Sequence, residues 1–360
     1  MKQTRLFRIK QVLKNGPITH FFFSDTIDAE YLSGFRSSNA FCLVSQTRNL
    51  LCSDFRYKEA AVLFCRKNPH WKFIEIREND ISKLSTYIPA KSIVAYQSDV
   101  VTVDQFGNLK KKLGKNIRFV KMPLSAKTAL LPKEDIEIGY MRKAANAADK
   151  AFATLLRSMQ LGMTEKQAAL MLEKFCKKNG SEKPSFDTIV LFGKRAALPH
   201  GVPSDVRLKT GDWVLCDFGC TIRGYCSDMT RTFVFGKASA RQKEIYDVVL
   251  RAQRVGKDAV KEQALACDVD KACREIIVKA GYGKLFGHAT GHGVGLRIHE
   301  KPRISKTDKT ILEQGDVITI EPGIYESAFG GVRIEDMVVV TKTGCDVLTQ
   351  SDRDLIEVGS

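Results

Sequence analysis

Four acidic residues in the second half of the chain each lie within, or at the end of, a run of apolar residues that predicts a β-strand. They are Asp217, Asp228, Glu321 and Glu335. A carboxylate that points into a folded core is costly unless a positive charge or hydrogen-bond donors accompany it. The fold of this chain must therefore supply partner charge close to these strands.

The histidines are concentrated in the same half of the chain. The chain has six, of which His20 and His70 lie in its first third. The remaining four lie within one hundred residues of one another: His200, His288, His292 and His299. Histidine is the side chain that titrates near neutral pH, so this concentration indicates a functional site in the second half.

The four carboxylates together with His292 make a set that can bind two divalent ions. Their four negative charges offset four positive charges, and a mixture of oxygen and nitrogen ligands suits Mn, Co, Fe or Zn. Two ions about 3.5–4 Å apart can clamp a bridging water, lower its pKa and polarise a carbonyl. Each residue also has an ordinary interpretation, as a hydrogen-bonded strand aspartate or a turn histidine. Their joint order favours the metal site.

Five short segments carry a family resemblance. In chain order they are Asp217-Phe218-Gly219, Ser227 to Thr232, Thr290 to Gly295, Glu321 to Tyr325 and Val332 to Asp336. In this order they resemble the pita-bread metallopeptidase family, which includes aminopeptidase P, prolidase, methionine aminopeptidase and creatinase. The similarity covers roughly residues 134–349.

The order of predicted elements in this region agrees with the resemblance. A long helix is expected over 133–160, and capping-box patterns at Thr164 and Ser239 open further helices. Strand runs follow each helix pair, including a β-hairpin whose second arm is 225–235 and a last strand over 332–340. We therefore expect an α+β pita-bread catalytic domain with pseudo-twofold duplicated halves, although the two halves show no strong sequence identity.

The first third predicts a separate α/β domain, because strands alternate with helical segments. Phe41–Val44 and Asn49–Cys52 predict a strand pair. The segments Tyr31 to Phe35 and Ser53 to Tyr57 are similar to motifs of the creatinase-like N-terminal domain. This domain argues against methionine aminopeptidase, and the complete ligand set argues against creatinase. With the boundary at Leu131-Pro132, we expect domains 1–130 and 131–360.

The resemblance implies a role for each ligand. Asp228 and Glu335 would bridge both metals. Asp217 would hold one metal, and His292 with Glu321 the other. Glu321 would also act as general base toward the bridging water, whose pKa the metals lower. Manganese is the expected metal, with Co or Zn as alternatives.

The resemblance also implies substrate contacts. His299 matches a histidine that donates to the developing oxyanion, and His200 matches one over the substrate pocket, so both join Glu321 as catalytic candidates. His288 matches a histidine near a proline subsite. Tyr325 and Arg333 match residues that support the metals and the substrate backbone. The alternatives are that His288 fills the pocket wall and that Arg333 is a structural counter-ion.

The family resemblance predicts an Xaa-Pro aminopeptidase, which removes one residue before proline. An Xaa-Pro bond has no N–H, so a site that offers an apolar wall and makes no bond to that nitrogen accepts it. The alternative within the family is prolidase, an Xaa-Pro dipeptidase. Its pocket needs a cation for the substrate's free carboxylate, which the sequence does not place. Ala289 departs from the expected Gly or Arg, which leaves the shape of this subsite open.

The charge balance raises an alternative of another class. The formal net charge is +16 and the pI is near 9.3. This excess suits a catalytically inactive pita-bread protein or a nucleic-acid binding module. The basic residues are spread along the chain, however, and the densest run, Lys110-Lys111-Lys112, lacks interleaved aromatics. We therefore expect a solvated basic surface and no nucleic-acid partner.

The cellular setting is predicted from what the sequence contains. We find no apolar stretch of membrane-spanning length and no signal region after the basic N-terminus. The ten cysteines are scattered without a CxxC pair, which is typical of reduced thiols. A cytoplasmic enzyme without a membrane partner is expected, and the family resemblance implies a homodimer.

Overall fold

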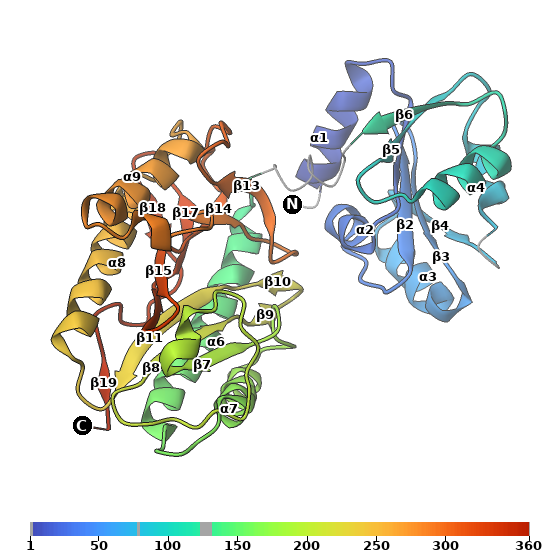
Figure 1. The fold of residues 1–360 in the computed structure, drawn as a ribbon. Coiled ribbons are helices and arrows are strands. Elements are labelled where there is room, and N and C mark those ends of the chain that lie inside the picture. Colours follow the sequence, from blue (N-terminus) through green and yellow to red (C-terminus); the bar gives the residue numbers. More distant parts are fainter. Residues whose placement is uncertain (1–2, 78–79, 123–131, 360) are drawn as a thin grey trace. The chain divides into compact units, whose positions relative to one another are not determined.

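The computed structural model describes residues 3–77, 80–122 and 132–359. The chain divides into two compact units, residues 1–131 and 132–360 (Figure 1). Leu131, the residue before the expected domain boundary, lies outside the described residues.

The first unit is built around one six-stranded sheet with the order β4-β3-β2-β1-β5-β6. Antiparallel pairing joins β2 to β3, as expected for this segment, while β3–β4, β1–β5 and β5–β6 are parallel. The strands are β1 His20–Phe23, β2 Ala40–Ser45, β3 Asn49–Ser53, β4 Trp71–Glu75, β5 Ile93–Gln97 and β6 Arg118–Met122. The helices are α1 Gln3–Lys14, α2 Thr26–Ser33, α3 Lys58–Lys67 and α4 Val103–Leu113, with short 3₁₀ turns η1 Phe55–Tyr57 and η2 Ile81–Tyr87.

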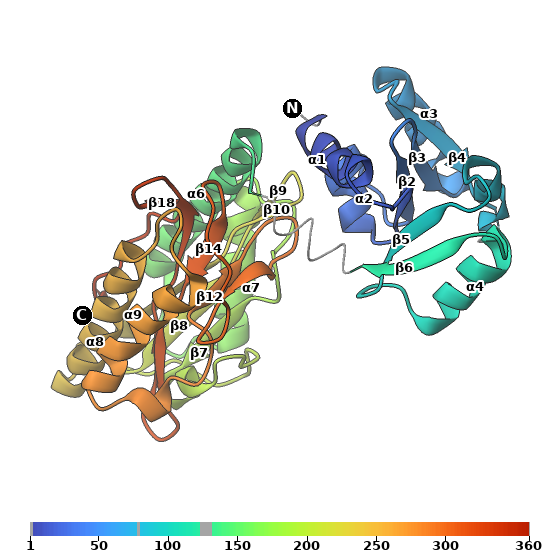
Figure 2. The same cartoon turned by 90° about the horizontal axis from the view of Figure 1, so that it is seen from above.

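The second unit combines two helix pairs with two main sheets. Helix α6 packs against α7, and α8 packs against α9. Helices α8 and α9 lie side by side in both views (Figures 1 and 2). The helices are α6 Asp135–Ser158, α7 Glu165–Lys178, α8 Ala240–Asp258 and α9 Ala266–Lys279, with short 3₁₀ turns η3 Gly193–Ala197 and η4 Gly283–Leu285. Two helices followed by strands, twice over, is the duplicated order expected from the sequence.

The sheets of this unit carry the candidate site. One has the order β19-β11-β8-β7, the other β13-β12-β14-β17-β18. Their strands are β7 Ile189–Phe192, β8 Trp213–Phe218, β11 Met229–Phe235, β19 Glu357–Val358, β12 Gly291–Gly293, β13 Glu300–Ile304, β14 Val317–Ile320, β17 Asp336–Val340 and β18 Cys345–Val347. The unit also contains two small two-stranded hairpins: β9 Thr221–Ile222 with β10 Tyr225–Cys226, and β15 Gly323–Glu326 with β16 Gly330–Arg333.

Local sequence signals explain where the helices begin. Thr164 and Ser239 both form the expected capping boxes, each with a glutamine three residues later. Helix α9 begins at Ala266, after Leu265, which offers no side-chain cap. The alanines on one face of α6 are buried and let Phe152 pack on the sheet, with its ring 6.3 Å from that of Phe218. This packing fixes β8 against the helix layer.

Two strands that the sequence predicts as continuous are broken in the structure. Strand 225–235 is interrupted at Ser227-Asp228, and strand 332–340 at Ile334-Glu335. At the first break the backbone of Ser227 approaches Gly219 so closely that a Cβ on residue 219 would lie 1.8 Å from the Ser227 carbonyl oxygen, so this approach requires glycine. Asp228 and Glu335 both lie at these breaks, so their side chains are not bound to the alternation of a regular strand.

The end of the chain closes the sheet that carries β8 and β11. Strand β19 pairs in parallel with β11 at Val234 and Phe235. The buried Arg231 side chain donates to the backbone carbonyls of Ser351 and Asp352. The C-terminal segment therefore packs against the core of the second unit.

None of the helices in the described ranges combines the length and the hydropathy that crossing a bilayer requires.

Candidate metal centre

The fold brings the five predicted ligand side chains to one place. His292 Nε2 lies 3.5 Å from Asp228 Oδ2 and 3.4 Å from Glu321 Oε1. One possible ligand atom from each of Asp228, His292 and Glu335 lies within 4.8 Å of the others. The fourth carboxylate, Asp217, acts electrostatically on Asp228, Glu321 and Glu335. They come from β8, the break before β11, β12, the end of β14 and the break before β17.

The hydrogen bonds of His292 reveal its protonation. Its Nδ1 lies 3.0 Å from the Gly293 carbonyl oxygen, which can only accept, so we place the ring proton on Nδ1. Burial lowers the pKa of His292 to about 4, so the ring is neutral at neutral pH. Its Nε2 lone pair therefore faces carboxylate oxygens of Asp228 and Glu321. Lone pairs that face one another in this way need a cation between them.

The four carboxylates carry more negative charge than the side chains around them offset. Burial, followed by repulsion from neighbouring carboxylates, raises the pKa of Asp228 and of Glu335. Burial raises the pKa of Glu321 to about 8, with the charge of Arg333 opposing the shift. Arg333 supplies one positive charge against four carboxylates, and the buried Asp217 Oδ1 has no hydrogen-bond partner among the described residues. This donor set fits a pair of divalent ions.

Arg333 organises the centre from behind. Its guanidinium donates to Asp217 Oδ2 (2.5 Å), to the Tyr325 hydroxyl (2.8 Å) and to Thr230 Oγ1 (2.9 Å). Thr230 in turn donates to Glu335 Oε2 at 2.7 Å. One buried side chain thus orients two of the five carboxylate and histidine groups. Thr230 lies within the Ser227 to Thr232 motif, but no sequence signal distinguishes it from its neighbours.

His288 is connected to the same network. Its Nδ1 lies 2.7 Å from the Ala289 carbonyl oxygen, which places the proton on Nδ1, and its Nε2 accepts from the Tyr325 hydroxyl at 2.9 Å. Burial, followed by the charge of Arg333, lowers the pKa of His288 to about 4. His288 therefore presents a neutral ring whose nitrogens are both engaged.

A buried pair on α9 holds the segment that carries His288. Asp270 accepts two hydrogen bonds from Arg274, and it also accepts from the backbone N–H and hydroxyl of Thr290. Arg274 donates further to the carbonyls of Phe286 and His288. Asp270 and Arg274 were missed because an acid and a base four residues apart on a helix are usually an exposed pair. Here Asp270 is buried and the Arg274 side chain is only 12% exposed.

The two remaining histidines lie at the open side of the centre. The ring of His299 is centred 4.4 Å from that of His292. Partial burial, followed by the charge of His200, lowers the pKa of His299. His200 also acts electrostatically on His288, so the structure brings the three histidines together. His200 and His299 are both exposed, as groups that meet a substrate must be.

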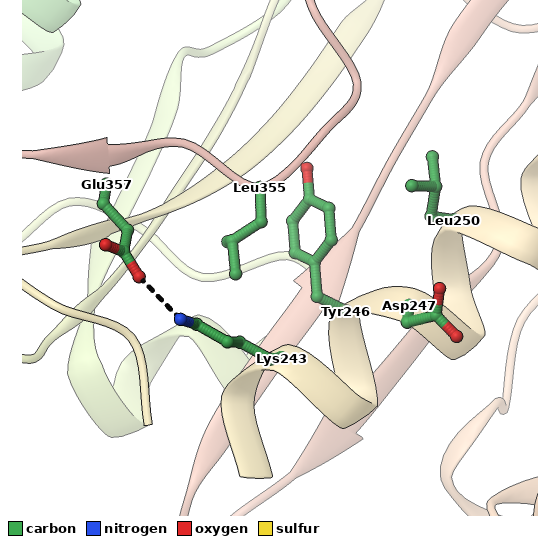
Figure 3. A pocket seen from close by; sticks show the side chains of 6 residues that line it. All are labelled: Lys243, Tyr246, Asp247, Leu250, Leu355 and Glu357. Atoms are coloured by element: carbon green, nitrogen blue, oxygen red, sulfur yellow. Dashed lines mark ion pairs between the residues drawn. The ribbon is translucent and has the colours of Figure 1, made fainter. Parts of the chain in front are cut away.

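A surface cavity of about 480 Å³ lies elsewhere, between α8 and the C-terminal segment (Figure 3). Its polar groups are already engaged: Lys243 pairs with Glu357 at 3.3 Å, and the Tyr246 hydroxyl donates to the carbonyl of Arg353. None of the five clustered groups lines it. The candidate site is therefore the carboxylate and histidine cluster rather than this cavity.

A pH dependence follows for protein stripped of metal. The pKa of Glu321 is about 8 in the folded protein against an ordinary value of 4.5, so the folded state holds a proton that the unfolded chain releases between these pH values. The free energy of unfolding should therefore fall as pH rises through this window. We expect a lower unfolding temperature at pH 8.5 than at pH 6, by about 2–4 °C per kcal/mol lost.

Calorimetry of chelator-treated and metal-restored protein at both pH values checks this expectation. Restored divalent ions should flatten the dependence, because they supply the missing positive charge. A metal-free protein that becomes more stable between pH 6 and pH 8.5 would contradict the proposed origin of the repulsion.

Comparison with known proteins agrees with this geometry. Residues 139–342 match the model of metallopeptidase family M24, and residues 5–125 match the creatinase/prolidase N-terminal domain. An Xaa-Pro dipeptidase of Pyrococcus horikoshii is 46% identical over 249 residues, which are 69% of this chain and 70% of that protein.

Solved structures are similar over nearly the whole length. An Xaa-Pro dipeptidase from Bacillus anthracis has a TM-score of 0.93 at 34% identity, covering 99% of this chain and 100% of the other. An X-Pro aminopeptidase from Thermotoga maritima has a TM-score of 0.87 at 32% identity, covering 98% and 100%. The expected fold class, an α/β domain followed by a pita-bread domain, is confirmed. The chain belongs to metallopeptidase family M24, in the branch with a creatinase/prolidase N-terminal domain, and is a metallopeptidase that uses divalent metal ions.

Proposed function

We propose that this metallopeptidase is an Xaa-Pro dipeptidase, which hydrolyses the bond before proline in two-residue peptides. Its similarity to the dipeptidases of Pyrococcus horikoshii and Bacillus anthracis carries the proposal. The aminopeptidase predicted from the sequence is the second candidate, supported by the similarity to the Thermotoga maritima enzyme. The comparisons favour the dipeptidase alternative.

Arg303 supplies the cation that a dipeptidase needs. It lies on β13 directly opposite His292, and its side chain is exposed. Its positive charge contributes to lowering the pKa of Glu321, His292 and His299, so it acts electrostatically on the centre. A guanidinium binds carboxylates with two hydrogen bonds. The free carboxylate of a substrate lies next to the scissile bond only when the proline that follows this bond is the last residue of the peptide.

The side chains then divide the work of hydrolysis. When bound, the divalent ions supply an acidified water and polarise the scissile carbonyl. Glu321 accepts a proton from the attacking water and passes it to the proline nitrogen, which must gain a proton as the bond breaks. His299 donates to the developing oxyanion. His200 and His288 enclose the substrate, and Arg303 binds its carboxylate.

Two peptides distinguish the candidates. Protein stripped of metal and restored with Mn, Co or Zn should cleave an Xaa-Pro dipeptide with a higher kcat/KM than the matching Xaa-Pro-Yaa tripeptide. Arg303→Ala should raise KM for the dipeptide by about 10- to 100-fold, the value of a hydrogen-bonded charge, and affect the tripeptide less. Arg303→Lys, which keeps the charge, should recover part of the loss.

Preferred cleavage of the tripeptide would replace the dipeptidase with the aminopeptidase. Equal effects of Arg303→Ala on both peptides would remove Arg303 from carboxylate recognition. Absence of cleavage with every metal would favour the catalytically inactive alternative.

We further propose manganese as the native metal and the cytoplasm as the location. Four carboxylates with a single imidazole suit Mn²⁺ well. All ten cysteines are free thiols, as in a reducing compartment. The homodimer remains a prediction of the family resemblance.

A further inference from the structure

An ion pair away from the candidate ligands joins the start of the second unit to the loop that carries His299. Lys133 Nζ donates to Glu300 Oε2 at 2.6 Å. The two side chains are only 5% and 7% exposed. The other oxygen of Glu300 accepts from the backbone N–H of Arg297 at 3.2 Å. One buried carboxylate therefore connects a distant lysine to the backbone of this loop.

The loop closes tightly around the carboxylate. Residues 294–299 connect β12 to β13, and a Cβ at Gly295 would lie 2.4 Å from Glu300 Oε1. The Gly295 carbonyl accepts from the Cys226 backbone N–H at 2.8 Å, which ties the loop to β10. His299 precedes Glu300 directly. Fixing the Glu300 side chain therefore fixes the backbone from which the imidazole of His299 extends.

Lys133 is itself held in place. Its backbone N–H donates to the Gly315 carbonyl at 2.9 Å. Gly315 has φ of +92°, and a Cβ there would lie 2.9 Å from the Lys133 carbonyl oxygen. Backbone contacts therefore hold Lys133 at the turn before β14, in contrast to the exposed lysines typical of a protein surface.

Stability alone does not explain such a pair. Removing two charges from water is expensive, and apolar residues of similar volume often replace a buried ion pair without loss of stability. What apolar residues do not reproduce is direction: the pair sets where the loop lies relative to β12. The rings of His299 and His292 are 4.4 Å apart at this point.

We propose that Lys133 and Glu300 are positioning residues for His299. Their ion pair holds the 294–300 loop so that the imidazole of His299 lies beside His292 and faces the scissile carbonyl. The catalytic part of this proposal rests on the proposed peptidase function. The part that concerns the loop rests on the contacts above and has its own measurement.

The double variant Lys133→Met/Glu300→Gln tests the pair without leaving a buried charge alone. Glutamine keeps an acceptor for the Arg297 N–H, and methionine fills the volume of the lysine stem. We expect kcat for an Xaa-Pro dipeptide to fall by about 10- to 100-fold, less than the loss of a whole oxyanion donor, while KM changes by less than about threefold. Hydrogen exchange of the 294–300 peptide should rise while the unfolding temperature stays within about 3 °C of the parent.

Two further variants sharpen the result. Lys133→Arg should keep kcat within about threefold, since a cation can still reach the carboxylate. The matched control is the exposed pair on α8, Arg251→Met/Asp247→Asn, which should change neither kcat nor exchange in the loop. Unchanged kcat with unchanged loop exchange in the Lys133→Met/Glu300→Gln variant overturns the proposal.

The other outcomes are equally decisive. A loss of activity that only follows the loss of folded protein, with KM and kcat both altered, shows a structural role and also overturns the proposal. If the parent cleaves neither peptide, the proposed function fails, and the exchange of residues 294–300 alone decides whether the ion pair holds the loop.

Discussion

Asp228→Ala is expected to remove both metal binding and activity. Asp228 is 4% exposed, and one of its oxygens lies close to ligand atoms of both His292 and Glu335. Two divalent ions contribute several kcal/mol of transition-state stabilisation. With about 1.4 kcal/mol per tenfold in rate, kcat/KM should fall by about 10³-fold or more. Elemental analysis after desalting and the dipeptide assay measure the two effects.

In metal-free protein the same substitution should increase the stability of the fold. Burial and the charge of Glu335 raise the pKa of Asp228, so its ionised form is unfavourable when no cation is bound. Asp228→Ala should then raise the unfolding temperature of chelator-treated protein, as expected where a site is built for function at the expense of stability. The exposed Asp187→Ala is the matched control and should change neither property. Two ions retained in Asp228→Ala would refute its bridging role.

Asp336→Asn is expected to have the largest effect on stability. The Asp336 carboxylate is fully buried and is contacted by three cations, Arg231 at 2.8 Å, Arg353 at 2.5 Å and Lys257 at 3.2 Å. These cations, with hydrogen bonds, hold the pKa of Asp336 well below its usual range in spite of its burial. The neutral amide leaves them without their buried counter-charge, which costs about 3–5 kcal/mol.

For a domain of this size such a loss lowers the unfolding temperature by about 6–20 °C. Calorimetry of metal-restored protein measures it. Asp354→Asn is the control, because its pair with Arg254 is exposed on both sides and is worth about 0–1 kcal/mol. A change of less than about 2 °C in Asp336→Asn would mean that the cluster is not held by this charge.

Signals that act within a few residues were sufficient to predict much of the fold. The capping boxes at Thr164 and Ser239 and the β2–β3 hairpin need only neighbours in the chain, and each prediction is confirmed. The breaks at Ser227-Asp228 and Ile334-Glu335 depend on backbone that approaches from elsewhere, such as Gly219. A pattern of apolar residues does not contain that information.

The residues of the candidate site also fall into two groups: those that motifs in the sequence indicate, and those that only the fold brings into place. Asp217, Asp228, His292, Glu321 and Glu335 were found from motif order, and their role as ligands stays a prediction that Asp228→Ala tests. Arg303 was not found, because only the strand register places it opposite His292. Asp270 and Arg274 were missed because their partners, the carbonyls of Phe286 and His288 and the backbone of Thr290, have no side-chain signature. The proposed preference for a dipeptide over a longer peptide rests on Arg303.

The pairing of β19 with β11 has a consequence for folding during synthesis on the ribosome. The sheet that carries Asp217 and Thr230 is completed by residues 357–358, and Arg231 finds its carbonyl partners only at residues 351–352. Domains generally fold in the order of synthesis, so the first unit can mature early. The second unit cannot complete this sheet until residues 351–358 have been synthesised, so the candidate ligands come together late in translation.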